Sequence, residues 1–535
     1  MSSAAEQYVL AIDLGTSGPK VGVVSASGVV AGSAFRPVQS FEVEDGGSEQ
    51  DPEAVWRAVV EASCEALEKS GVARDAVAAV ICDSHFFSIA GIGRDGKPSM
   101  NLLVWMDRRG RAENLNRAPG HRADSLWRQF QWWRIHGVPP LASGVDDISK
   151  LRWLRHYRPE VYERTAVFLE PMDYINYRLT GRATANLCSA FPLQHTDNRS
   201  LAHTEYDDTL LRYSGMDQEK LPELVPLDAV IGGLSAVASQ ALGLPRSVQV
   251  VTGVNDTQAG AVGCAAFQGS HAGIVLGSSG VYVSHAEKKK TDVLTGLFTL
   301  PSPVAGKYLM TGEGGVSGRA LEHFLESLLF ADDGFGRSVH EDPYGRLEAA
   351  AASSPPGSNG VLFLPWLNGS IAPINDEAMR GGFLNVSLGT RRVDLARAVL
   401  EGIAFQYHQL AGAARRFTGR SFSHHVLYGG GALSNTWAQI MADVLQSPVH
   451  RMAAPRLTNC LGLGMLAFER LGRVSFDEIA QRVPIEGLFE PKPALRALYE
   501  DKNAAMTLAF KQNRRVFRKL NQAVGSRTTP GTVAD

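Results

Sequence analysis

The hydrophobic pattern near the start of the chain predicts two short strands joined by a glycine turn. Residues 9–24 read VLAIDLGTSGPKVGVV, in which two β-rich runs flank LGTSGP. Glycines and small hydroxyl residues suit a tight turn, and neither a GxGxxG nor a Walker pattern is present, so the segment indicates a hairpin. One carboxylate, Asp13, interrupts the apolar first run. Because burial of an unpaired carboxylate is costly, we expect Asp13 to have a cationic partner.

The same pattern returns in the second half of the chain. Residues 273–285 read GIVLGSSGVYVSH, so LGTSG at 14–18 reappears as LGSSG at 276–280, again between β-rich runs. A repeat at this spacing suggests two similar halves, each with a turn whose amides and hydroxyls suit phosphate oxygens. In a cleft between such halves, Asp13 would bind Mg²⁺ through oxygen ligands. An ordinary glycine hairpin is the alternative for each copy taken alone.

Two further junctions carry candidate chemistry. Residues 247–267, SVQVVTGVNDTQAGAVGCAAF, predict a strand followed by a closely packed helix, with Asp256 at the junction. Asp256 is either an N-cap or a general base aimed at a hydroxyl that attacks a γ-phosphate. Residues 428–449, YGGGALSNTWAQIMADVLQSPV, follow the strand HHVLY and open a helix. A helix start of this kind favours an anion, or an adenosine lying on the glycines.

Composition limits the classes of partner. The chain has 535 residues, 44% of them hydrophobic, which predicts two or more domains. Its 53 basic and 55 acidic residues give a net charge of −2, which excludes a field that gathers nucleic acid or anionic membrane. Five scattered cysteines without a CxxC pair favour a reducing compartment. Without a signal-like N-terminus or a long apolar run, we expect a cytoplasmic chain with a small-molecule partner.

These segments resemble the motifs of the FGGY carbohydrate kinases, which belong to the superfamily of actin, acetate kinase and the chaperone ATPases. Further matches occur in family order at 102–110, 168–181, 381–405 and 460–467. The resemblance implies an α/β fold of two ribonuclease-H-like (actin-like ATPase) domains with a nucleotide/sugar cleft between them. We expect domains at 1–266 and 267–510, followed at 511–535 by a basic helix end and a disordered tail.

The resemblance also implies ATP, Mg²⁺ and a small sugar or polyol as ligands, and a homodimer as the family-based assembly. Asp256 corresponds to the catalytic base and Asp13 to the magnesium-linked carboxylate. The implied nucleotide-site residues are Gly15, Thr16 and Ser17 in the first phosphate loop, Gly277, Ser278 and Ser279 in the second, Gly318 at a nucleotide-side helix, and Gly430, Gly431 and Asn435 at the adenosine.

The substrate side departs from the family pattern. His85, Phe86 and Phe87 stand where ketopentose kinases commonly carry Gln-Met-His, and Thr257 stands where Gln or Asn is usual. His85 and its neighbours Asp83 and Ser84 either bind sugar hydroxyls or belong to a strand with core aromatics and a satisfied histidine.

The WMDRR segment keeps the family pattern at Trp105, Asp107 and Arg108. Asp107 and Arg108 either bind a sugar hydroxyl, or Asp107 forms a structural salt bridge with a nearby arginine. We expect a kinase for a ketopentose such as xylulose or ribulose. The alternatives are a kinase for glycerol or a tetritol, and a non-metabolic ATPase of the same superfamily.

Two aromatic or basic segments have a plain structural interpretation. Residues 122–137, RADSLWRQFQWWRIHG, interleave aromatics with arginines as single-strand binders do, but their helical spacing favours a core face with solvated charges. KQNRRVFRKLNQ at 511–522 predicts a solvated terminal helix.

Overall fold

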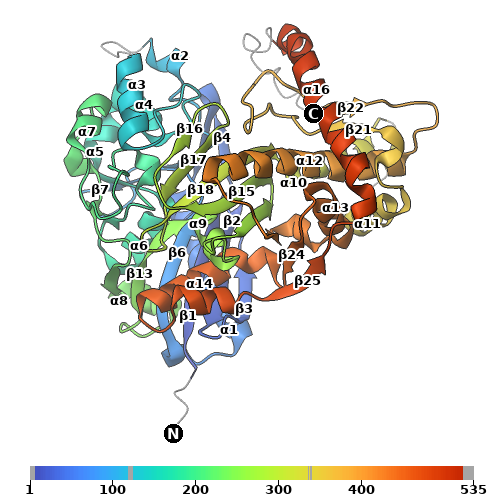
Figure 1. Cartoon of the computed structure of the whole chain (residues 1–535). Helices are drawn as coiled ribbons and strands as arrows, with labels where there is room; N and C mark the ends of the chain where they lie inside the picture. The colour runs from blue at the N-terminus through green and yellow to red at the C-terminus, as the bar shows by residue number, and fades with distance from the viewer. Residues whose placement is uncertain (1–5, 118–123, 335, 338–339, 522–535) are drawn as a thin grey trace.

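The computed structural model describes residues 6–117, 124–334, 336–337 and 340–521 of the chain (Figure 1). Two large sheets dominate it. The six-stranded sheet has the order β12-β13-β6-β1-β2-β3, with β12 at Val230–Gly233, β13 at Gln249–Asn255, β6 at Val77–Ser84, β1 at Tyr8–Gly15, β2 at Gly18–Ser25 and β3 at Val30–Phe35. The eight-stranded sheet has the order β16-β17-β18-β15-β14-β23-β24-β25, with β16 at Thr291–Asp292, β17 at Leu297–Pro301, β18 at Tyr308–Val316, β15 at Ser279–Ala286, β14 at His271–Leu276, β23 at His424–Tyr428, β24 at Val449–Met452 and β25 at Ile485–Phe489.

Both sheets follow one plan. In the first, β1 pairs antiparallel with β2 and parallel with β6, while β2 continues to β3 and β6 to β13. In the second, β14 pairs antiparallel with β15 and parallel with β23, while β15 continues to β18 and β23 to β24. The predicted hairpins at 9–24 and 273–285 are therefore confirmed, at equivalent places in two similar halves.

Helices cover both sheets. Against the first sheet pack α1, α6 and α8, at Pro52–Ser70, Pro171–Thr180 and Ala236–Leu242. Helix α1 begins at Pro52 after the N-cap Asp51 and ends at Gly71, whose left-handed conformation suits a C-cap. The second sheet packs with α10 (Gly318–Phe324), α11 (Pro343–Ser353), α12 (Arg392–Thr418), α13 (Asn435–Leu445) and α16 (Arg496–Asn521).

Two helices lie between the sheets. Helix α9 (Asp256–Gly263) comes from the first half, and α14 (Thr458–Arg470) comes from the second, yet α14 packs against β1, β2 and α9. A Cβ atom at Gly462 would lie 2.0 Å from the carbonyl oxygen of Ala259, so only glycine allows this approach of the two helices. A shared hydrophobic cluster containing residues of both halves results.

The remaining elements are short. They form the outer part of the first half and the connections of the second. The helices are α2 (Ala112–Leu115), α3 (Leu126–Ile135), α4 (Asp147–Tyr157), α5 (Pro159–Arg164), α7 (Asp208–Ser214) and α15 (Phe476–Gln481), and the strands are β4 (Phe41–Val43), β5 (Gly47–Gln50), β7 (Ala90–Gly93), β8 (Leu102–Leu103), β9 (Thr165–Leu169), β10 (Thr184–Ala185), β11 (Glu223–Leu224), β19 (Asp332–Asp333), β20 (Gly336–Arg337), β21 (Leu362–Leu364) and β22 (Gly382–Leu384).

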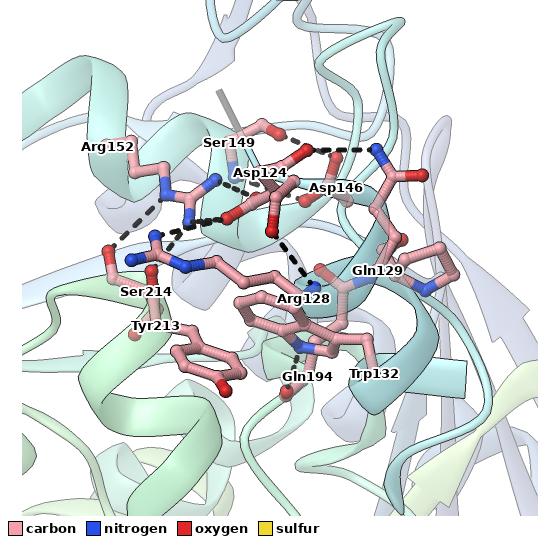
Figure 2. Close-up of polar contacts among 12 residues, drawn as sticks. Asp124, Arg128, Gln129, Trp132, Asp146, Ser149, Arg152, Gln194, Tyr213 and Ser214 are labelled. Carbon is pink, nitrogen blue, oxygen red and sulfur yellow. Dashed lines mark hydrogen bonds and ion pairs between the residues drawn. The ribbon is translucent and has the colours of Figure 1, made fainter. Parts of the chain in front are cut away.

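Helix α3 tests the interpretation of the aromatic and arginine-rich segment (Figure 2). Trp132 is fully buried and its Nε1 donates to the carbonyl oxygen of Gln194 at 3.1 Å. Asp124 accepts a hydrogen bond from Arg152 at 2.7 Å and lies 3.8 Å from Arg128. The core-face interpretation is thus confirmed for Trp132, and protein carboxylates engage the neighbouring guanidinium groups.

The same interpretation is wrong for the first turn of α3. Leu126, Trp127 and Phe130 are exposed, and the rings of Trp127 and Phe130 stack with centroids 5.7 Å apart. The reason is that the helix is only ten residues long and offers one narrow buried stripe, which Trp132 and Ile135 fill.

At the C-terminus, α16 confirms the predicted helix as far as Asn521, and most of its last turns are exposed. The expected disordered tail lies outside the described residues. The expected boundary at 266/267 falls in the connection between α9 and β14 and stays a prediction. In the described ranges, every helix is too short or too polar to cross a bilayer.

Candidate active site

Asp13 lies in the middle of the first sheet, near the end of β1. Asp13 is 7% exposed, and its Oδ2 is 3.2 Å from the Nζ of Lys20, its cross-strand neighbour on β2. Asn459 of α14 approaches the other carboxylate oxygen, with Nδ2 at 3.4 Å. Asp13 therefore has a charged partner within the protein, Lys20, and the expected role of Asp13 toward Mg²⁺ stays a prediction. The two-residue turn fixes the pairing of 13 with 20, so the hairpin pattern contained the signal for Lys20, which the sequence analysis missed.

Asp256 is the first residue of α9, and Asn255 is the N-cap. The N-cap interpretation of Asp256 is therefore wrong, because the helix begins at Asp256 itself, one residue earlier than that role requires. Asp256 Oδ1 accepts hydrogen bonds from the amide of Thr257 at 2.6 Å and from its hydroxyl at 3.1 Å. Burial, followed by the nearby charge of Asp13, raises the pKa of Asp256 from 3.8 to about 6. At neutral pH this carboxylate is ionised and accepts a proton more readily than an ordinary aspartate does.

Two more carboxylates lie near Asp13 and Asp256: Asp83, which the sequence analysis considered only as a contact for a sugar hydroxyl, and Glu313, which it did not consider. Asp83 on β6 is the register partner of Asp13 and is fully buried. Burial, together with Asp13 and Asp256, raises its pKa well above the ordinary value. Glu313 on β18 of the second sheet acts on Asp256 electrostatically, and desolvation raises the pKa of Glu313 although the residue keeps some exposure. Carboxylates from both sheets therefore share one electrostatic environment.

The first hairpin presents Thr16 and Ser17 at its turn. Trp105 Nε1 donates to the Thr16 hydroxyl at 2.9 Å, and Gln50 Nε2 donates to the Thr16 carbonyl at 2.7 Å. Gly15 closes the turn by pairing with Gly18, and Ser17 is exposed. Trp105 thereby joins the WMDRR segment to the first predicted phosphate loop.

The second hairpin presents Gly277, Ser278 and Ser279, and both serines are exposed. The amide of Gly318, at the start of α10, donates to the carbonyl of Gly277 at 2.7 Å, and the amide of Arg319 donates to the carbonyl of Ser278 at 3.2 Å. A Cβ atom at position 318 would lie 2.6 Å from the Gly277 carbonyl oxygen. Glycine is therefore required where this helix meets the turn.

The triple-glycine segment follows β23 as expected. Gly430 and Gly431 begin a short 3₁₀ turn, and α13 begins at Asn435, four residues after the glycines rather than directly on them. This turn contacts β14, which leads into the second hairpin. Asn435 is exposed and its Oδ1 accepts a hydrogen bond from Arg451 at 2.5 Å. The sequence analysis did not identify Arg451 as a partner of Asn435, because Arg451 lies on another element, strand β24.

On the substrate side, His85 follows the end of β6 and is turned into the protein. It is buried, its Nδ1 lies 2.9 Å from the Ser88 hydroxyl, and burial together with Lys150 lowers its pKa to about 4. Phe86 and Phe87 are half-buried; Phe86 packs against the shared hydrophobic cluster and its ring contacts that of Phe191, so the core-aromatic interpretation agrees with Phe86 in part. Of the two roles for this segment, the satisfied histidine agrees with the geometry.

Asp107 forms the structural ion pair that was one of its two interpretations. The side chain is fully buried, and its oxygens accept hydrogen bonds from Arg109 at 2.5 and 3.0 Å and from the Ser48 amide at 3.2 Å. A sugar hydroxyl would have to displace these donors. Arg108 and Trp105 are exposed, and Thr257 is bonded to Asp256.

The donor set around Asp13 suits a hard cation. Carboxylate oxygens of Asp13 and Asp83 lie together, and Asp83 Oδ2 is a buried atom without a hydrogen-bond partner among the described residues. Mg²⁺ is usually held by one or two carboxylates and by substrate phosphates. The part of the chain that the structure describes contains no cluster of three or more His, Cys, Asp or Glu side chains arranged to hold a metal.

Solved structures share the overall fold of this chain. The crystal structure of a gluconate kinase from Lactobacillus acidophilus matches with a TM-score of 0.83 and 24% identity, covering 96% of this chain and 100% of that one. A Plasmodium falciparum glycerol kinase solved with ADP matches with a TM-score of 0.80 and 18% identity, covering 95% and 98%. The fold is the two-domain α/β arrangement of these kinases, an actin-like ATPase fold, as the sequence predicted.

The sequence comparisons give the family. Models of the FGGY family of carbohydrate kinases match residues 8–263 with the N-terminal domain and residues 272–469 with the C-terminal domain. A xylulose kinase from Staphylococcus epidermidis is 25% identical over 516 residues, covering 96% of this chain and 98% of that protein. The chain belongs to the FGGY family of carbohydrate kinases, and it is a sugar or polyol kinase.

Proposed function

We propose that this kinase transfers the γ-phosphoryl group of ATP to a hydroxyl of a ketopentose, with Asp256 as the base. The observation that carries the proposal is the position of Asp256, at the start of a helix between two equivalent glycine hairpins, with a pKa near 6. A carboxylate at this place can orient an acceptor hydroxyl and take its proton.

The transfer is a displacement at phosphorus. The acceptor oxygen forms a bond to the γ-phosphorus as its proton passes to an Asp256 oxygen, and the bond from that phosphorus to the β,γ-bridging oxygen breaks, which releases ADP. The transition state is loose and spreads its charge over the phosphoryl oxygens, so positioning and electrostatic stabilisation do most of the work. The hydroxyls of Thr16, Ser278 and Ser279 and the amides of both turns are the groups that we assign to the phosphates.

Mg²⁺, when bound, neutralises charge on the phosphates and orients them. We assign Asp13 to the cation, directly or through water, because its carboxylate lies beside Asp83 and its only ion pair in the described chain is with Lys20. Gly430, Gly431, Gly318 and Asn435 remain assigned to the nucleotide. The glycerol kinase solved with ADP supports nucleotide use by this fold.

The choice of a ketopentose rests on the xylulose kinases among the relatives. A second candidate is an aldonate such as gluconate, because a gluconate kinase is among the structures with this fold. The half-buried Phe86 and Phe87, in place of the usual Met and His, favour an acceptor with an apolar C–H face. Trp105, Arg108 and Thr257 are the remaining proposed acceptor contacts.

The test is release of ADP from Mg·ATP with a panel of ketopentoses, aldonates, glycerol and tetritols. Strong stimulation by a ketopentose supports the proposal. Stimulation by gluconate or glycerol alone would show that this compound, and not a ketopentose, is the acceptor. Hydrolysis that is the same with and without every acceptor would favour the non-metabolic ATPase. Asp256→Asn should abolish the stimulated rate with any acceptor.

A further inference from the structure

One carboxylate next to Asp13, that of Asp83, has no role in the proposed reaction. Asp83 lies on β6, which runs parallel to β1, and the two aspartates are register partners. Register partners on neighbouring strands direct their side chains to the same face of a sheet. The Asp83 carboxylate therefore lies beside that of Asp13, and each strengthens the negative potential at the other.

The bonding of Asp83 is incomplete. Its Oδ1 accepts one hydrogen bond, from the amide of Leu14 at 3.2 Å; the Asp13 carboxyl is a close neighbour that raises the pKa of Asp83, and Oδ2 has no donor among the described residues. The residue has no exposed surface, so a sugar hydroxyl does not reach it in this conformation. A buried carboxylate in this state requires a positive neighbour or a proton.

The local charge is strongly unbalanced. Asp83 interacts electrostatically with Asp13 and Asp256, and Asp256 interacts with Asp13 and Glu313; within the described residues the only salt bridge that any of the four makes is from Asp13 to Lys20. One ammonium group therefore faces four carboxyl groups. A divalent cation with oxygen ligands is the species that balances such a group in a site for nucleotide phosphates.

The geometry points to Asp83 as the second carboxylate of the divalent-cation site, acting through Asp13. Because Asp83 lies beside Asp13 and is fully buried, it is a positioning residue that does not itself contact the cation. It fixes the Asp13 carboxylate and adds negative charge next to it. This inference rests on the proposed function only in that it takes the cation to accompany a nucleotide. It assigns a role to a residue that the family motifs in this chain do not include.

The test measures how strongly the metal and the nucleotide favour each other's binding. ADP is titrated calorimetrically into the full-length protein with and without Mn²⁺, and the ratio of the two dissociation constants is the coupling. We expect Asp83→Asn to lower this coupling roughly tenfold and to change the affinity for ADP alone less than twofold. Asparagine keeps the shape and donates a hydrogen bond to Asp13, so the metal-free fold should be retained.

Asp173→Asn is the matched control. Asp173 on α6 is equally buried, also has a carboxylate oxygen without a partner, and has a pKa raised by burial to about 8. This variant should keep the wild-type coupling. A loss of coupling in Asp173→Asn equal to that in Asp83→Asn would overturn the inference, because it would reflect a general effect of removing a buried carboxyl.

Coupling within twofold of wild type in a folded Asp83→Asn protein would also overturn it. Asp83→Ser is the second variant, and failure of both variants to fold would contradict the inference too, since a group that serves the cation is dispensable for folding. The assay contains no acceptor. A protein that couples Mn²⁺ to ADP as expected but phosphorylates no sugar would contradict the proposed function and leave the role of Asp83 in place.

Discussion

Replacing Asp256 by asparagine should remove the reaction and stabilise the protein at the same time. Burial and Asp13 raise the pKa of this carboxyl from 3.8 to about 6, so the folded chain holds it ionised at neutral pH at a cost. A shift of about two units corresponds to at most about 3 kcal/mol, and partial exposure lowers the expected gain to about 1–2 kcal/mol. The proposed proton acceptor thus weakens the fold that carries it.

The sign of the pH dependence follows from the raised pKa. A carboxyl whose folded pKa exceeds its unfolded pKa binds protons more tightly in the native state, so its ionisation destabilises the fold above about pH 6. The gain in the free energy of unfolding for Asp256→Asn should be full above this pH and vanish below about pH 4. Urea unfolding of both proteins at several pH values measures the difference.

Turnover gives the second readout. With saturating Mg·ATP, kcat/KM for the acceptor should fall about tenfold per pH unit below about pH 6, as the base becomes protonated. Asp256→Asn should lower kcat by about 10²–10⁴ and leave nucleotide affinity within about threefold. Asp173→Asn, at a buried carboxyl with no assigned part in the reaction, should gain stability and keep kcat. An Asp256→Asn enzyme with near-normal turnover, or a flat wild-type profile down to about pH 5, would refute the reasoning.

Three further substitutions test individual contacts. Trp105→Phe removes the 2.9 Å hydrogen bond to the Thr16 hydroxyl and should raise KM for ATP about threefold to tenfold in steady-state kinetics, with the melting temperature unchanged. Gly318→Ala places a Cβ atom 2.6 Å from the Gly277 carbonyl, so it should displace the second turn and raise KM for ATP at least about tenfold, while circular dichroism shows the same helix content. Asp107→Asn breaks a buried ion pair and should lower the free energy of unfolding by about 3 kcal/mol without a selective change in KM for the acceptor; a selective rise in that KM at unchanged stability would favour direct sugar contact.

Local patterns in the sequence were sufficient for the hairpins and the junctions around them. Gly15 and Gly18 close the first turn, and the β-rich runs on either side can pair only antiparallel over so short a connection. The second copy follows for the same reason. The start of α13 at Asn435 agrees with the pattern, whereas the N-cap of α9 was misplaced by one residue, because the choice of N-cap depends on side-chain geometry.

The contacts between distant segments were outside the reach of the sequence. The pairing of Asp13 with Asp83 depends on the register of two parallel strands joined by a long crossover, which no local pattern encodes. Lys20 is the contrary case, because the two-residue turn alone fixes its position opposite Asp13. His85 shows a third situation: its imidazole is held by Ser88, three residues away, and such a local bond competes with any role toward a ligand.

The distribution of charge differs between the α3–α4 surface and the surroundings of Asp13. Arg128 of α3 and Arg152 of α4 share Asp124, so these two arginines contribute little positive field for an anionic polymer. Around Asp13 the balance is reversed, with carboxyl groups of two sheets in excess over one lysine. We expect such a site to repel free phosphate anions and to bind a nucleotide more tightly together with a cation. Burial and the charge of Asp13 raise the pKa of Asp256, so the charge for which we propose a cation also prepares the proposed base.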